Sequence, residues 1–150
     1  MKLKIGDLAP EINAKDQHGN TITLKQFRGK KVVLYFYPKD STPGCTKEAC
    51  NFRDNYASLQ QKGYEVIGVS VDSEKSHQKF IAKYELPFTL IADEDKKVVN
   101  DYGLWQLKKF MGREYMGTVR TTFVIDEKGV LEKIIEKVDT TDSAAQVLSK

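Results

Sequence analysis

Apolar residues occur in two kinds of pattern, which take turns along the chain. Short runs rich in β-branched and aromatic residues occur at 30–38 (KKVVLYFYP), 64–72 (YEVIGVSVD) and 88–93 (FTLIAD). Such runs are typical of strands that are covered on both faces of a sheet. Pro38 ends the first run because it cannot donate a ladder hydrogen bond. Between the runs, apolar residues recur every three or four positions, which predicts helices. The order therefore predicts β-α-β units with parallel strands.

The longest predicted helix begins at Pro43, which is tolerated in a first helical turn, and runs to about Gln61. Phe52, Tyr56 and Leu59 give this helix an apolar stripe, and a glycine follows it as a stop signal. Three further helical segments are expected at 73–86, 93–103 and 142–150.

Turn signals predict a hairpin near each end of the chain. Gly19 and Asn20 lie between two short β-prone runs within 12–24, and segment 119–138 gives two strands joined across 126–129. The class is therefore α/β, with a mixed central sheet flanked by helices and an N-terminal β-hairpin. We expect a thioredoxin-like architecture, and residues 1–150 with 40% hydrophobic content suit a single domain.

Charge and hydropathy narrow the functional classes. The net charge of +3 comes from 24 basic and 21 acidic residues that are spread along the chain, which predicts neither a nucleic-acid arm nor a membrane patch. The N-terminal segment has no apolar leader, and no later segment approaches the roughly 20 apolar residues of a spanning helix. We therefore expect a cytoplasmic protein.

Cysteine usage indicates chemistry rather than structural cross-linking. Cys45 and Cys50 are the only two cysteines, too few for a disulfide framework, and their Cys-x4-Cys spacing is not a familiar half of a zinc site. His18 and His77 are far away in sequence, so we expect no structural metal and interpret both histidines as solvated side chains.

The segment TPGC places Cys45 within the first turn of the long helix. A thiol attacks as its thiolate, and the unpaired N–H groups at a helix N-terminus favour an anion. Gly44 permits close approach of another molecule, and Thr42 adds a hydroxyl. Plainer interpretations are that Cys45 is a small apolar residue, that Cys50 belongs to the core, and that Thr42 is an ordinary N-cap.

Segment 35–54 (YFYPKDSTPGCTKEACNFRD) resembles the active-site signature of peroxiredoxins, Pro-x3-Thr-x2-Cys, which Pro38, Thr42 and Cys45 match. The Cys-x4-Cys spacing and the TPGCTKEA sequence are similar to the branch called peroxiredoxin Q or bacterioferritin comigratory protein. Segment 102–126 (YGLWQLKKFMGREYMGTVRTTFVID) is similar to the same branch, whereas the last segment, 138–150, matches it only loosely. We therefore expect the loose match to affect the last helix rather than the chemistry.

The resemblance implies a role for each matching residue. Cys45 is expected to be the peroxidatic cysteine and Cys50 the resolving cysteine, while Thr42 and Arg120 contact the thiolate and the peroxide. Arg53 is the rival to Arg120, since nothing local in the sequence says which arginine reaches Cys45.

The resemblance further implies that Pro38 shields the pocket and that Glu48 helps to orient an arginine. The implied substrate is a hydroperoxide, and the implied partner is a thioredoxin-like reductant that reduces a Cys45–Cys50 disulfide. No cofactor is needed, and an intramolecular disulfide makes a monomer workable.

Two other functions would also use a reactive cysteine. A low-molecular-weight phosphatase needs a phosphate-cradling loop that closes on an arginine just after the cysteine, whereas Arg53 lies eight positions on. A non-catalytic redox switch or holdase would use the cysteine pair without turnover.

The helical spacing of the two cysteines carries a prediction of its own. On one continuous helix, five residues separate their Cα atoms by roughly 8 to 9 Å, whereas a disulfide tolerates no more than about 7 Å. Formation of the bond therefore requires the helix from Pro43 to about Asn51 to unwind.

Overall fold

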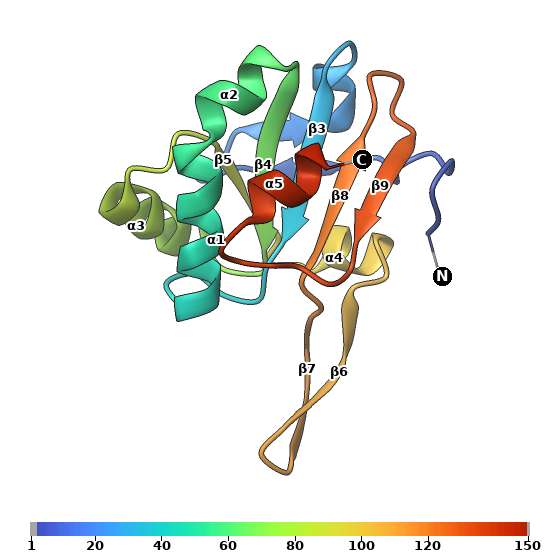
Figure 1. Cartoon of the computed structure of the whole chain (residues 1–150). Helices are drawn as coiled ribbons and strands as arrows, with labels where there is room; N and C mark the ends of the chain where they lie inside the picture. Colours follow the sequence, from blue (N-terminus) through green and yellow to red (C-terminus); the bar gives the residue numbers. More distant parts are fainter. Residues whose placement is uncertain (1–2, 150) are drawn as a thin grey trace.

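A mixed five-stranded sheet forms the centre of the fold in a computed structural model that describes residues 3–149 (Figure 1). Its strands in spatial order are β5 (Thr89–Ala92), β4 (Tyr64–Ser70), β3 (Lys31–Phe36), β8 (Thr121–Ile125) and β9 (Leu131–Ile135). The first three are parallel to one another, and β8 and β9 run antiparallel to their neighbours. This arrangement confirms the predicted α/β class and the mixed sheet.

Alternate residues of β3 point to opposite faces of the sheet, so both faces are covered. Val33 and Tyr35 pack in one apolar cluster with the helix that carries both cysteines, and Leu34 and Phe36 pack in the other. The first face holds α1 (Pro43–Asp54), α2 (Tyr56–Gln61), α3 (Glu74–Tyr84) and α5 (Ser143–Leu148). The second holds the 3₁₀ helix η1 (Leu24–Phe27) and α4 (Lys97–Asp101).

The predicted helix over 43–61 is wrong in one respect, because it divides into α1 and α2 at Asn55. The Asn55 side chain donates a 2.8 Å hydrogen bond to the carbonyl of Asn51, and its backbone leaves the helical region with φ −109° and ψ 5°. A short amide side chain that bonds a nearby carbonyl competes with the regular helical ladder. The apolar stripe continues across the break, which explains why the periodicity gave no sign of it.

Both terminal hairpins are present as predicted. The N-terminal one pairs β1 (Asn13–Lys15) with β2 (Thr21–Thr23), and β8 pairs with β9 across the predicted turn. Among residues 3–149, no helix combines the length and the apolar character that crossing a membrane requires.

A further hairpin, which the sequence pattern did not predict, projects beyond the sheet (Figure 1). It pairs β6 (Trp105–Phe110) with β7 (Arg113–Thr118), and its turn residues Met111 and Gly112 have φ values of 52° and 79°. Two positive φ values suit the two-residue turns that match strand twist. Most of its side chains are exposed, so the hairpin lacks the alternation of a half-buried strand that would have revealed it.

Candidate active site

The loop after β3 delivers Cys45 to the beginning of α1. Thr42 occupies the N-cap position with extended backbone, and its carbonyl accepts a 2.9 Å hydrogen bond from the amide of Thr46. Cys45 is the third residue of α1 and is 1% exposed. The thiol therefore lies in the first turn of the helix, where the positive end of the helix dipole favours an anion.

Arg120 lies in the short link between β7 and β8, far from Cys45 in the sequence, and its side chain contacts the thiol. Its Nη2 donates to Cys45 Sγ at 3.2 Å, and its Nη1 donates to Glu48 Oε1 at 2.8 Å. Burial lowers the pKa of Arg120, but Cys45 and Glu48 outweigh it and raise the pKa above its usual value. The guanidinium is therefore a fixed positive charge between a sulfur and a carboxylate.

Arg53, the rival arginine, is engaged elsewhere. Its Nε donates to Asp54 at 2.9 Å, and its Nη1 donates to the carbonyl of Tyr84 at 2.7 Å. It lies on the same helix as Cys45 but at the opposite end. The structure therefore brings Arg120, and not Arg53, to the thiol.

Glu48 is one turn along α1 from Cys45 and is fully buried. Burial raises the pKa of Glu48 above its usual value. The charge of Arg120 and the hydrogen bonds from Arg120 and Ser143 offset only part of this rise. Ser143 Oγ lies 3.0 Å from Glu48 Oε2 and 2.8 Å from the carbonyl of Asp139. Glu48 thus holds one half of the guanidinium fork and leaves the other half for the sulfur.

Thr42 and Pro38 lie in the segment that leads from β3 to Cys45, and both are half-buried. Thr42 Oγ1 donates to the carbonyl of Lys39 at 2.9 Å and does not cap the helix. No hydrogen bond joins Thr42 to Cys45 within 3–149. The hydroxyl proton is therefore used inside the loop, and the oxygen lone pairs remain as acceptors.

Cys50 lies on the same helix as Cys45 and is partly exposed, and both cysteines are free thiols. Because α1 is continuous from Pro43 to Asp54, the estimate of roughly 8 to 9 Å between their Cα atoms applies. The pair lies in the arrangement for which helix unwinding was predicted.

Residues outside the signature add one contact to the site and correct one expectation. Ser143 belongs to the loosely matching C-terminal segment, yet it contacts Glu48. His77 was expected to be solvated but is fully buried, whereas His18 is exposed as expected. The sequence did hold a signal, since His77 precedes Phe80 and Ile81 by three and four positions and so shares the apolar stripe of α3.

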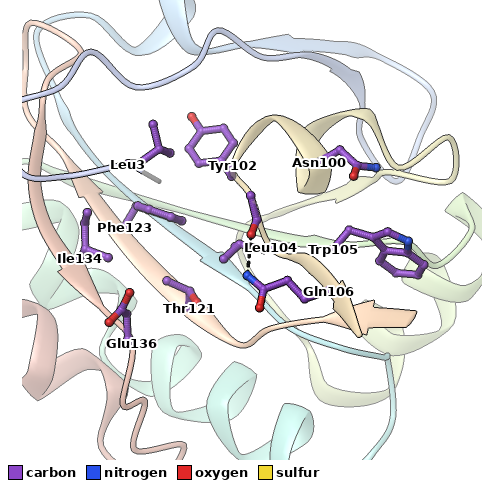
Figure 2. A pocket seen from close by; sticks show the side chains of 11 residues that line it. Leu3, Asn100, Tyr102, Leu104, Trp105, Gln106, Thr121, Phe123, Ile134 and Glu136 are labelled. Carbon is purple, nitrogen blue, oxygen red and sulfur yellow. Dashed lines mark hydrogen bonds between the residues drawn. The ribbon is translucent and has the colours of Figure 1, made fainter. Parts of the chain in front are cut away.

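A pocket of about 660 Å³, whose lining side chains are drawn in Figure 2, does not include Cys45 among the residues that line it. Thr121, Phe123 and Tyr102 line it, and the latter two pack on the face of the sheet that α4 covers. Cys45 belongs to the cluster on the opposite face. Arg120 and Thr121 are adjacent in sequence, but their side chains point to opposite faces of the sheet, because successive side chains of an extended chain alternate.

Comparison with known proteins agrees with this geometry. Residues 5–134 match the AhpC/TSA family. The chain is 47% identical to Peroxiredoxin Bcp of Bacillus subtilis, with 99% of this chain and 94% of that protein covered. It is 42% identical to Peroxiredoxin Bcp of Escherichia coli K12, with 98% and 94% covered.

Among solved structures, Xanthomonas campestris peroxiredoxin Q superposes with a TM-score of 0.85 at 34% identity, covering 91% of this chain and 87% of that one. A mutant of Xylella fastidiosa PrxQ superposes with a TM-score of 0.92 at 30% identity, covering 99% and 94%. The fold is therefore that of the thioredoxin-like peroxiredoxins, which are thiol peroxidases. The chain belongs to the AhpC/TSA family and, within it, to the Bcp or peroxiredoxin Q branch.

Proposed function

We propose that the chain reduces hydroperoxides through Cys45 and forms a disulfide with Cys50, which a thioredoxin-like dithiol protein then reduces. The observation that carries the proposal is the contact between Arg120 and Cys45 Sγ at the start of α1. The helix N-terminus and the guanidinium both favour the thiolate, which is the attacking form.

In the first step the thiolate attacks the terminal peroxide oxygen, so that an S–O bond forms and the O–O bond breaks. The departing hydroxide or alkoxide gains a proton, and Cys45 becomes a sulfenic acid. Arg120 stabilises the negative charge that moves onto the oxygens. Thr42 Oγ1, whose proton is donated to Lys39, accepts a hydrogen bond from the peroxide O–H. Pro38 would screen the reacting oxygen from water.

In the second step the Cys50 sulfur attacks the sulfenic sulfur, a disulfide forms and water leaves. The helix spacing of roughly 8 to 9 Å must first shrink to a disulfide distance, so α1 unwinds between the two steps. A dithiol protein then exchanges with the Cys45–Cys50 bond and restores both thiols. Because both cysteines belong to one chain, a monomer in the reducing cytoplasm suffices for the cycle.

Replacement of Cys45 tests the proposal. The Cys45→Ser variant should fold but lose peroxide consumption in an assay coupled to thioredoxin, thioredoxin reductase and NADPH. Residual turnover above a few per cent of the wild-type rate would contradict the assignment. A wild-type protein that forms the disulfide but never turns over would instead be a redox switch or holdase.

A further inference from the structure

A second buried polar cluster lies beside the loop that leads to Cys45. His77 on α3 is fully buried, with Nδ1 at 2.7 Å from Asp40 Oδ2 and Nε2 at 2.8 Å from the carbonyl oxygen of Ile91. A carbonyl can only accept, so Nε2 carries a hydrogen. An ionised carboxylate can also only accept, so Nδ1 carries one as well. The ring is then an imidazolium that bridges β5 and the loop.

Asp40 is the centre of this cluster and is 6% exposed. Its carboxylate also accepts from Tyr37 Oη at 2.6 Å and from Ser76 Oγ at 2.8 Å. Its amide donates to Asp72 Oδ2 at 2.8 Å. The two oxygens of one carboxyl group are thus contacted by three side chains. Through Asp40, the loop is therefore bonded to the end of β3, to α3 and to the turn after β4.

The anchor lies immediately before the reacting residues. Asp40 is two positions before Thr42 and five before Cys45, and the intervening Ser41 has φ 62°. A non-glycine residue in this left-handed region is strained and persists only where its surroundings hold it. The bond from Thr42 Oγ1 to the Lys39 carbonyl spans the same strained residue.

We propose that His77 is a positioning residue of the peroxide site, which holds Asp40 and thereby the loop that aims Thr42 and the first turn of α1. This inference rests on the proposed peroxidase function. His77 touches neither Cys45 nor Arg120 through any hydrogen bond in 3–149, so it acts through the loop. Loss of the anchor relaxes Ser41 and shifts Thr42, which is the N-cap residue of the helix that carries Cys45.

The anchor depends on the charge of His77. The ionisable groups that face the ring are Asp40 from the loop, Tyr37 from the end of β3 and Asp72 from the turn after β4. Burial lowers the pKa of His77, but the bonds and charges of Asp40 and the Ile91 carbonyl outweigh it and raise the pKa. Below this raised pKa the ring therefore makes both bonds, and as the pH rises past it the ring keeps a single N–H and must give up one of them.

The test compares His77→Gln with His18→Gln, which is the same replacement at an exposed histidine. The first-turnover rate of hydrogen peroxide with the reduced protein should fall about 10- to 100-fold in His77→Gln, because a shift of about 1 Å in a reacting group costs up to that much. His18→Gln should react like the wild type. The wild-type rate should also decline on the alkaline side, and His77→Gln should lack that decline.

Alkylation of Cys45 by iodoacetamide separates positioning from stability. A loosened loop exposes the buried thiol, so alkylation in His77→Gln should stay constant or become faster while peroxide reduction slows. Parallel loss of both reactions would mean a merely structural role and would overturn the inference. An unchanged peroxide rate, or an alkaline decline that persists in His77→Gln, would overturn it too.

Ser76→Ala offers a milder second variant, because it removes one donor to Asp40 and leaves the ring in place. It should change both rates in the same directions by a smaller factor. Hydrogen exchange at the amides of Asp40 and Thr46 reports the loop without any turnover, and both amides should exchange faster in either variant. Unchanged protection would overturn the inference, whereas a wild-type protein without peroxidase activity would overturn only the proposed function.

Discussion

Asn51 joins α1 to the C-terminal segment, so its removal should accelerate the opening that disulfide formation requires. Its Nδ2 donates to the carbonyl of Thr141 at 3.1 Å, and its Oδ1 accepts from the amide of Ala144 at 2.9 Å. Unwinding of α1 as far as Asn51 breaks both bonds. The loss of these two bonds therefore raises the free energy of the open state relative to that of the closed state.

The size of the effect follows from the two hydrogen bonds. Each contributes about 0.5–1.5 kcal/mol net. Because Asn51 is only half-buried, we expect about 1–2 kcal/mol in total from this pair. Loss of this energy in Asn51→Ala favours opening, and therefore the rate constant of disulfide formation, by about 5- to 30-fold. The free energy of opening enters this rate constant because α1 opens before Cys50 attacks.

The assay mixes reduced protein with one equivalent of hydrogen peroxide, quenches it by alkylation and counts sulfenic, disulfide and sulfinic forms by mass spectrometry. Asn51→Ala should form the disulfide faster and yield less sulfinic acid at high peroxide, because resolution competes with a second oxidation. The first oxidation of Cys45 should not change.

Gln146→Ala is the matched control. The Gln146 amide also makes two hydrogen bonds, to the carbonyl of Lys137 and from the amide of Asp139, but neither involves α1. An equal acceleration in Gln146→Ala would show that general loosening of α5 is responsible. No acceleration in Asn51→Ala would show that opening of α1 does not limit resolution.

Three further predictions concern single side chains. Arg120→Lys should slow the first oxidation about 10- to 150-fold in stopped-flow kinetics. A lysine cannot bond both the sulfur and Glu48 as the guanidinium does, and a charged hydrogen bond is worth about 1.5–3 kcal/mol. A larger loss of rate in Arg53→Lys would refute this prediction. Cys50→Ser should be oxidised once and then progress to the sulfinic acid instead of turning over with thioredoxin. Measurement of the intact mass checks this prediction. Sustained turnover would show that another thiol resolves the sulfenic acid. The pKa of His77 is higher in the folded protein than its value of about 6.5 in the unfolded chain. His77 should therefore stabilise the fold fully when the pH is below the unfolded pKa, and this contribution should be lost as the pH rises through the folded pKa. The difference in melting temperature between wild type and His77→Gln should therefore shrink from pH 6 to pH 9, and a constant difference would contradict the charge assignment.

Local patterns determined much of this molecule. The buried strands, the hairpin turn at Gly19 and Asn20 and the start of α1 after Thr42 all depend on neighbours within a few residues. The helix N-terminus that favours the Cys45 thiolate belongs to this group, and so does the helical separation of Cys45 from Cys50. Such features follow from backbone sterics, capping and apolar periodicity, which a window of sequence contains.

Only the tertiary structure decided which distant side chains meet. Arg120 lies 75 positions from Cys45, Ser143 lies 95 positions from Glu48, and Asp40 lies 37 positions from His77. The same residue types in the sequence would equally permit Arg53 at the thiol and a solvated His77. Their choice depends on how β3 pairs with β8 and how α1, α3 and α5 pack on one face of the sheet, because that packing sets which charges lose water and must find partners.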